Sequence, residues 1–142
     1  MNISLILFLV WIGAIQALTP NLPQTTHTLE VEVQEIRQLS GTLRVCLVAN
    51  KEAFLSSCLH STHTSVQHGV EVLEFPNLEL GTYAVSLYQD LDDNGKLNQE
   101  GLFGMPSEPY GFSNNPRSLF RPPSFEKCAF KLSSDSRIVV RL

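Results

Sequence analysis

The stretch Leu29-Glu30-Val31-Glu32-Val33-Gln34 decides the fold class, because apolar and polar residues alternate strictly along it. Side chains of a β-strand point to opposite faces with a period of two, so the pattern predicts a strand with one buried and one solvated face. The same alternation returns in residues 43–49 and 83–87. The sequence therefore predicts an all-β protein whose buried positions are the odd-numbered ones in these segments.

Shorter segments with strand character complete the predicted fold. Gly, Pro, Asn and Ser separate them, as expected for turns. We expect one hairpin from the strands at 29–34 and 43–49 and a second from those at 62–67 and 70–75, while residues 50–55 predict one helical turn capped by Asn50. The last predicted strands are 127–132 and 137–142. Together these segments predict an antiparallel β-sandwich of about seven strands, immunoglobulin-like or prealbumin-like.

Residues 90–125 show no strand period, and so long a stretch inside a compact domain is either functional or a sign of a wrong assignment. It contains many large apolar side chains, among them Phe103, Tyr110, Phe112 and Phe120. We expect one long loop packed over an end or a face of the sandwich. Burial of Tyr110, Phe112 and Phe120 is the favoured prediction, and an exposed platform that these three form for a ligand is the alternative.

The long stretch opens with an acidic segment, Asp90-Leu91-Asp92-Asp93-Asn94-Gly95-Lys96-Leu97-Asn98-Gln99-Glu100. Calcium takes six to eight oxygen ligands, and a loop with side-chain oxygens at positions 1, 3, 5 and 9, a glycine at 6 and a carbonyl at 7 wraps them around one centre. The predicted ligands of a weak calcium site are Asp90, Asp92, Asn94, the Lys96 carbonyl, Asn98 and Glu100.

The match to a calcium loop is incomplete at its end. Position 12 is Gly101, so the carboxylate that this position normally supplies has to come from Glu100, one place early, or from Glu108 further along. A strand feeds into the segment, which excludes a pair of EF-hand helices. Two alternatives stay open. One is a metal-free turn, since Asp, Asn and Gly favour turns, and the other is a different cation.

Several strings of the second half resemble one known family. They are Leu80-Gly81-Thr82-Tyr83-Ala84-Val85, the acidic segment, Gly104 to Asn115 with Tyr110-Gly111-Phe112-Ser113-Asn114-Asn115, and Pro122-Pro123-Ser124-Phe125. The chain from Leu29 to Leu142 is similar to the bacterial family called domain of unknown function 2141. The resemblance implies a secreted or periplasmic bacterial β-sandwich with no established activity. Asn98 stands where the family pattern leads us to expect Asp, which removes one charged ligand.

The amino-terminal residues predict export. Residues 3–15 are apolar and uncharged, too short for a membrane span of about 20 residues, and Thr19-Pro20 follows soon after. We expect a signal peptide at 1–17, a linker at 18–27 and a single β-sandwich domain at 28–142. An uncleaved anchor is the alternative. The mature protein is expected to be secreted or periplasmic, without membrane insertion after cleavage.

Three cysteines in an exported chain allow one intramolecular disulfide. Strand parity turns Cys46 away from the core, within reach of Cys58, so this pair is favoured, with Cys128 as a buried thiol. Three free thiols or a pair that includes Cys128 are the alternatives. His60, His63 and His68 lack the spacing of a zinc site and are expected to be solvated.

Composition narrows the function class. With 10 Lys and Arg against 14 Asp and Glu, the net charge is -4, so nothing indicates a nucleic-acid surface. The leading hypothesis is a calcium-stabilised module, not an enzyme, that binds a glycan, a cell-wall component or a protein outside the cytoplasm. The alternative is a hydrolase or carbohydrate-active enzyme that uses carboxylates of the 90–125 loop.

Overall fold

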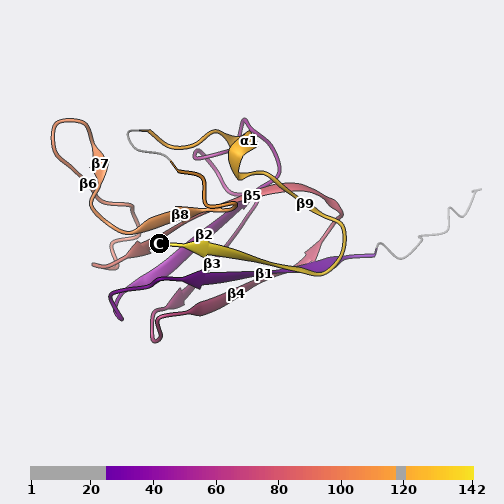
Figure 1. Ribbon diagram of the computed structural model, residues 1–142, viewed down its shortest axis with the longest axis horizontal. Coiled ribbons are helices and arrows are strands. Elements are labelled where there is room, and N and C mark those ends of the chain that lie inside the picture. The colour runs from indigo at the N-terminus through magenta and orange to yellow at the C-terminus, as the bar shows by residue number, and fades with distance from the viewer. Residues whose placement is uncertain (1–24, 118–120) are drawn as a thin grey trace, which may run out of the picture.

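A computed structural model describes residues 25–117 and 121–142 of the chain (Figure 1). The predicted signal peptide, its cleavage point, residues 18–24 of the predicted linker and Phe120 lie outside the described residues. The first described strand begins at His27, the last residue of the predicted linker. None of the helices in the described ranges is long and apolar enough to cross a membrane.

The described part of the chain is almost entirely β-structure, as the alternation predicts. Its elements, in chain order, are β1 His27–Gln34, β2 Thr42–Val48, β3 His60–Ser65, β4 Glu71–Leu78, β5 Gly81–Asp90, β6 Gln99–Glu100, β7 Met105–Pro106, β8 Tyr110–Phe112, α1 Phe125–Cys128, β9 Phe130–Leu132 and β10 Ser136–Arg141.

Two sheets form the sandwich, and a small hairpin projects from it. One sheet has the order β10-β1-β4, the other has the order β3-β2-β5-β8 with β9 also paired to β5, and β6 pairs with β7. All pairs are antiparallel except β1 with β10, which run parallel. Figure 1 shows β10 beside β1 and the β6–β7 hairpin standing away from the sheets.

Both predicted hairpins are wrong, although their strands are present. β1 and β2 lie in different sheets, and so do β3 and β4. Each connection crosses from one sheet to the other and turns an apolar side chain inward, Ile36 in the first crossing and Val66 in the second. The two crossings lie side by side, since the Val66 N–H donates to the Gly41 carbonyl over 3.0 Å.

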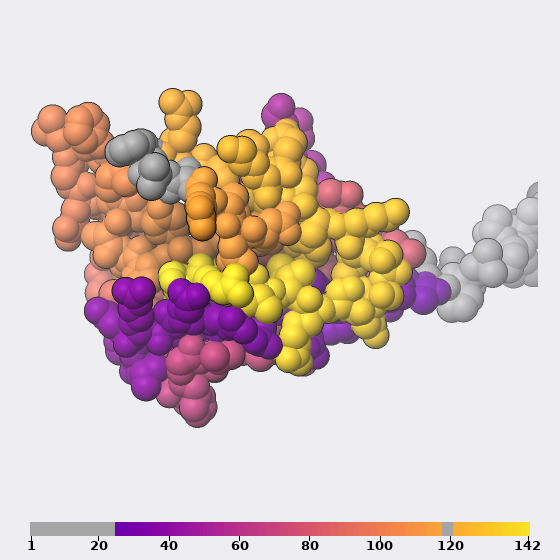
Figure 2. All heavy atoms as spheres, in the orientation of Figure 1, coloured from indigo at the N-terminus to yellow at the C-terminus, as the bar shows by residue number. Residues whose placement is uncertain are grey.

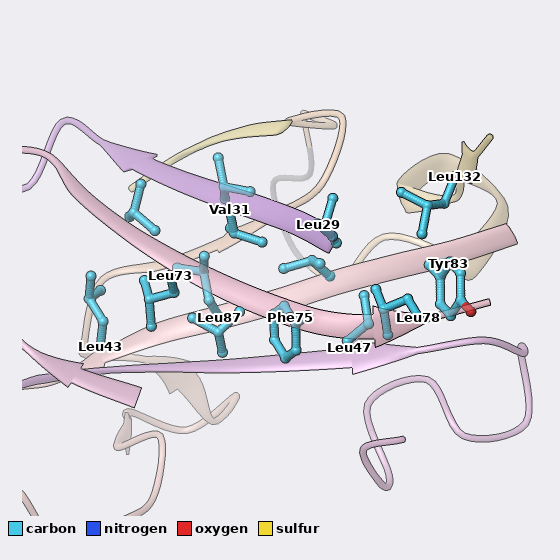
Figure 3. Packing of buried hydrophobic residues seen from close by; sticks show 14 of the residues in the cluster. Leu29, Val31, Leu43, Leu47, Leu73, Phe75, Leu78, Tyr83, Leu87 and Leu132 are labelled. Atoms are coloured by element: carbon cyan, nitrogen blue, oxygen red, sulfur yellow. The ribbon is translucent and has the colours of Figure 1, made fainter. Parts of the chain in front are cut away.

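The main core lies between the two sheets and follows the predicted parity. Leu29 and Val31 of β1 are fully buried and belong to one cluster with Leu47 of β2 and Leu87 of β5 (Figure 3). Val33 of β1 is fully buried in the same cluster. Burying each such side chain contributes roughly 1.5–3 kcal/mol. The alternation that decides the fold class is therefore also the pattern that fills the core.

The predicted strand at 127–132 is corrected in its first half. Residues Phe125–Cys128 form the single helical turn α1, closed by a 2.8 Å hydrogen bond from the Ala129 N–H to the Phe125 carbonyl, and the strand begins at Phe130. Cys128 is nevertheless buried, in a second small cluster with Val48 and Ala84 on the outer face of the five-stranded sheet. The predicted cap by Asn50 is present, because its Oδ1 accepts the Ala53 N–H at 2.9 Å.

The predicted packed loop at 90–125 is only partly correct. Its second half packs, since β8 joins the five-stranded sheet and Phe112 is half-buried against Phe54. Its first half does not, because the β6–β7 hairpin carries Leu102 and Phe103 at its tip, 97% and 88% exposed. Tyr110 is also exposed, at 36%. The expected packing of the loop is therefore wrong for the hairpin, and the expected burial is wrong for Tyr110.

The string Tyr110 to Asn115 joins the two sheets along one side of the sandwich. A Cβ on Gly111 would lie only 2.7 Å from Val140 Cγ1 and 2.8 Å from the Arg141 carbonyl oxygen, so only glycine allows this approach. The Asn115 side chain then pairs with the backbone of β10 as a neighbouring strand would. Its Nδ2 donates to the Val139 carbonyl at 2.9 Å, and its Oδ1 accepts the Arg141 N–H at 2.8 Å. Figure 2 shows the yellow carboxy-terminal strand between the indigo β1 and the orange residues of this region.

Two further side chains of the same string anchor it to neighbouring backbone. The Ser113 hydroxyl accepts the Val85 N–H at 2.9 Å and donates to the Cys128 carbonyl at 2.6 Å. Asn114 adopts a φ of 64° and donates to the Ala129 carbonyl at 2.8 Å. The residues of the Tyr110 to Asn115 string, the most specific part of the family resemblance, therefore have structural roles. Their side chains hydrogen-bond to neighbouring backbone groups, and Gly111 allows β8 to approach β10 closely.

Candidate functional site

Asp90 is the centre of the acidic loop and stands at the end of β5, fully buried. Its Oδ2 accepts hydrogen bonds from Arg44 Nε at 2.6 Å and from the Gly95 N–H at 2.8 Å, and its Oδ1 accepts the Asn94 N–H at 3.0 Å. The carboxylate thus folds the following five residues around itself, and Gly95 meets the required turn with a φ of 80°.

The ionised form of Asp90 is favoured despite burial. Burial raises the pKa of Asp90, but the hydrogen bond from Arg44 and those from the Gly95 and Asn94 N–H groups outweigh it and hold the pKa below its ordinary value. The same hydrogen bond from Arg44 to Asp90 raises the pKa of the guanidinium. The loop is therefore built around a permanent negative charge that faces a permanent positive one.

Glu108 closes the loop from the far side of the β6–β7 hairpin and is 6% exposed. Its Oε1 accepts the Leu91 N–H at 2.8 Å and its Oε2 accepts the Asn98 N–H at 2.9 Å. The Ser107 N–H donates to the Asn98 carbonyl at 2.9 Å beside it. One carboxylate thus ties both ends of the acidic segment to the return strand of the hairpin.

Three carboxylates meet at this point. One oxygen from each of Asp90, Asp92 and Glu108 lies within 4.8 Å of the others, which is close enough for the group to hold a metal ion. A carboxylate oxygen has two lone pairs, so Asp90 Oδ1 and both Glu108 oxygens, which each accept one hydrogen bond, keep one for a cation. The cluster combines two buried carboxylates with the exposed one of Asp92.

The other predicted ligands surround this cluster at different depths. Asn94 and Asn98 donate their Nδ2 groups to Asp92 Oδ2, each at 2.9 Å, and Asn94 Oδ1 accepts the Lys96 N–H at 2.8 Å. Asn98 Oδ1 also accepts a hydrogen bond from Asn94 Nδ2 at 2.8 Å, so both amide oxygens are engaged within the turn. Lys96 is an exposed residue of the same turn.

Glu100 does not take part in the cluster. It lies in β6, paired with Met105, and is exposed. Of the two carboxylates considered for the twelfth position of the loop, the structure brings Glu108 to Asp90 and Asp92. Seven residues separate Glu100 from Glu108 and most of them belong to the projecting hairpin, which is why spacing within the loop alone does not select Glu108.

Arg44 is the participant that the sequence analysis missed. It lies on the outer face of β2, opposite Tyr88 of β5, and only the pairing of β2 with β5 brings it to Asp90. The available signal is its even position in a strand whose odd positions are buried, which places it on the outer face. Its partner could not be inferred, because strand parity does not say which strand lies alongside.

The cysteine predictions are confirmed. Cys46 and Cys58 form a disulfide with a Cα–Cα distance of 5.4 Å, and Cys128 is a free, buried thiol. Burial raises the pKa of the Cys128 thiol to about 11. Because disulfides persist in oxidising compartments, the Cys46–Cys58 bond favours a location outside a reducing cytoplasm. The histidines at 60, 63 and 68 are exposed, as expected.

Comparison with known proteins identifies the chain by family. No curated protein and no solved structure matches it. A family profile described as uncharacterized protein conserved in bacteria, domain of unknown function 2141, matches residues 31–139, which span both sheets and the acidic loop. The matched range covers most of the chain and includes the Tyr110 to Asn115 string. This protein therefore belongs to the bacterial family of the domain of unknown function 2141.

Proposed function

We propose that the protein is an exported β-sandwich module that binds calcium at its acidic loop and serves a binding or structural role outside the cytoplasm, not catalysis. The observation that carries this proposal is the approach of Glu108 to Asp90 and Asp92 within 4.8 Å. That approach supplies the carboxylate missing from the loop itself, so first, third and twelfth-position ligands are all represented.

Calcium suits this set better than other common ions. The ligands are oxygens from carboxylates, amides and a carbonyl, which hard cations prefer, and the described cluster contains no imidazole or thiolate that would favour zinc. The loop is irregular and partly exposed, and calcium tolerates irregular geometry better than magnesium does. With Asn at positions 5 and 9 the site falls in the weak extracellular class, with a Kd of about 0.1–1 mM.

A bound ion would lock the hairpin to the sandwich. Asp90 belongs to β5, whereas Glu108 follows β7, so one cation held by both fixes the start and the return of the β6–β7 excursion. Without a cation, the carboxylates of Asp92 and Glu108 repel each other and the negative charge of Asp90, which Arg44 offsets only in part. Calcium therefore stabilises this end of the fold.

The environment of Asp90 supports a non-catalytic role. A general acid needs a raised pKa near the working pH, whereas Arg44 and two N–H groups hold the pKa of Asp90 below its ordinary value, against the effect of burial. Glu108 uses both oxygens on backbone N–H groups. These carboxylates are arranged to hold a loop and a cation, which disfavours the hydrolase alternative.

Thermal unfolding in chelator, calcium and magnesium tests the calcium site. At about 10 mM calcium, a Kd of about 0.1–1 mM adds roughly 1.4–2.7 kcal/mol of stability, which raises the Tm by several degrees, and magnesium adds less. The variants Asp92→Asn and Glu108→Gln should lose this increment. Glu100→Gln is the matched control, because it removes one charge from the same segment but lies outside the cluster, and it should keep the increment.

Two results would contradict the proposed site. Equal midpoints in chelator and in calcium, at matched ionic strength, would show that the segment is only a turn. A calcium increment that disappears in Glu100→Gln but survives in Glu108→Gln would restore the ligand set expected from loop spacing and reject the cluster seen here.

The exported location rests on the apolar run at 3–15 and on the disulfide. We expect the mature protein to begin near Leu18 and to be recovered without its leader, because that run is too short to span a membrane. Mass spectrometry of the protein from the producing cells measures this. An intact Met1 in the membrane fraction would support the uncleaved anchor instead.

A further inference from the structure

A groove crosses the outer face of the five-stranded sheet beside the acidic loop, whose Leu97 and Gln99 line one end of it. Its floor consists of side chains from β2, β5 and β8, and we call it the outer groove: Arg44, Cys46, Ser86, Tyr88, Tyr110 and Phe112. The strand register places them in two rows, because Arg44 lies opposite Tyr88 and Tyr88 opposite Tyr110, while Cys46 lies opposite Ser86 and Ser86 opposite Phe112. Directly opposed residues share one face of a sheet, so these six form a continuous surface.

The outer groove has the size and walls of a small-molecule site. Its largest part is a cavity of about 420 Å³ between Leu55 and the β6–β7 hairpin, and two adjoining cavities of about 260 and 250 Å³ continue it across the sheet. Pockets for small ligands are commonly about 300–1,000 Å³ and mostly apolar. Phe103 and Met105 form the hairpin wall and the Cys46–Cys58 disulfide lies along the floor.

The chemistry changes along the groove. The hairpin end is lined mostly by aliphatic and aromatic side chains, including Leu55, Phe103 and Phe112, with Gln99 and Arg121 as its polar members. The opposite end is lined by Arg44, His63 and the hydroxyl residues Ser61, Thr62 and Tyr88. His63 and Tyr88 flank Arg44 on the two neighbouring strands, which gathers hydrogen-bond donors around one guanidinium.

Charge selects the ligand further. The protein carries a net charge of -4, yet among the described residues that line the three cavities there is no Asp or Glu, while Arg44, His63 and Arg121 are present. Arg44 donates a hydrogen bond from its Nε to Asp90, and its side chain remains 34% exposed beside the groove. The lining therefore offers cationic and hydrogen-bonding groups to an anion with an apolar body, while the nearest carboxylates, such as Asp90 on the other side of Arg44, belong to the acidic loop.

We propose that the outer groove binds an anionic amphiphile, such as a medium-chain fatty acid, with its chain between Leu55 and Phe103 and its carboxylate at Arg44 and His63. The proposal names a ligand class for the binding role proposed above, and it does not require bound calcium, because hydrogen bonds among Asn98, Ser107 and Glu108 already hold the base of the hairpin. Binding measurements made in chelator therefore separate its failure from a failure of the calcium site.

The test is calorimetric titration of the full-length mature protein, in chelator, with three probes below micelle-forming concentrations. Decanoate should bind at one site. Decyltrimethylammonium, which has the same chain and the opposite charge, should bind at least tenfold more weakly. Acetate, which is the head without the chain, should give no measurable heat, because the apolar body supplies most of the affinity.

Matched variants locate the ligand at each end. Phe103→Ser should weaken decanoate binding on the order of fivefold, whereas Leu102→Ser, an equally exposed neighbour that lines none of the cavities, should not change it. His63→Glu should weaken binding about fivefold or more through repulsion of the carboxylate. His60→Glu makes the same charge change on the same strand outside the groove and is its control.

Several outcomes would overturn the proposal. Equal affinity for decanoate and decyltrimethylammonium would reject the anionic head, and equal effects of Phe103→Ser and Leu102→Ser would reject the groove. Sedimentation equilibrium that finds a dimer dissociated by Phe103→Ser would show that a second copy occupies the groove. Binding of chitohexaose in place of decanoate, lost in Tyr110→Ala, would identify a glycan site instead.

Discussion

Replacing Arg44 by Met tests the ion pair on which the acidic loop is built. Asp90 is fully buried, and Arg44 is its partner at 2.6 Å. The substitution keeps an apolar stem of similar length on β2 and removes the charge. Asp90 would retain the hydrogen bonds from the Gly95 and Asn94 N–H groups, at 2.8 and 3.0 Å, so its charge would remain partly stabilised.

The expected loss of stability follows from burial on both sides of the pair. Removing one member of a fully buried pair costs about 3–5 kcal/mol, and one hydrogen bond to a charged group contributes about 1.5–3 kcal/mol. Arg44 is 34% exposed, so solvent partly screens its charge, and two hydrogen-bond donors to Asp90 remain. The smaller of the two energies, that of one hydrogen bond to a charged group, therefore applies. We expect a loss of about 2 kcal/mol at pH 7, or roughly 6–10 °C in Tm for a domain of this size.

The pH dependence has a defined sign. Because the pKa of Asp90 in the folded protein is below its ordinary value, the carboxylate contributes stability that is present above about pH 4 and is lost as the pH falls through the folded pKa. The difference between the parent protein and Arg44→Met should therefore be full at pH 7 and shrink below pH 4. Chemical unfolding at a series of pH values, in chelator, measures it.

Arg137→Met is the matched control, because Arg137 pairs with Glu30 and Glu32 on the other sheet and is 53% exposed. An exposed pair is expected to contribute less than about 1 kcal/mol. If Arg44→Met and Arg137→Met have equal effects, or if the effect of Arg44→Met is the same at pH 3 and pH 7, the explanation of the loop through Asp90 is incorrect.

Two further predictions concern the Tyr110 to Asn115 string and the free thiol. Asn115→Ala should cost about 1–3 kcal/mol, because it removes two hydrogen bonds to β10 and puts alanine, which adopts left-handed backbone less readily than asparagine, at a φ of 47°. Amide exchange at Arg141 should accelerate, and unchanged exchange would count against the pairing of the Asn115 side chain with β10. Cys128, with a pKa of about 11, should react with iodoacetamide at pH 8 roughly a hundredfold or more slowly in the folded than in the unfolded protein, and comparable rates would show that the thiol is accessible.

The sequence predicted buried faces well and strand neighbours poorly. Alternation in β1, β2 and β5 states which side chains leave water, and Leu29, Leu43 and Val85 are indeed fully buried. Alternation carries no information on which strand pairs with which, and both expected hairpins, which pair strands adjacent in the sequence, are wrong. Ile36 and Val66, single apolar residues inside polar connections, were the available sign that the chain crosses the core there.

The part of the candidate site that depends on local spacing could be predicted from the sequence, and the part that depends on long-range contacts could not. Asp90, Asp92, Asn94 and Gly95 lie within one turn, so their spacing determines their proximity, and the disulfide followed from strand parity. Glu108 and Arg44 reach the same point through a hairpin and through a sheet pairing. Neither long-range contact is encoded in local spacing.

The parallel pairing of β1 with β10 has a consequence for when the protein can fold. It joins residues such as Glu30 and Arg137, 107 positions apart, so β1 has only one of its two neighbours until the last strand is available. Contacts between distant positions slow folding, since a long chain segment must be ordered before they form. A chain emerging from the ribosome therefore lacks one edge of its first sheet until β10 is made, and it stays unfolded for longer than a sandwich closed by local hairpins. Under the export proposed above, that delay would coincide with the interval in which an unfolded chain can be threaded across a membrane.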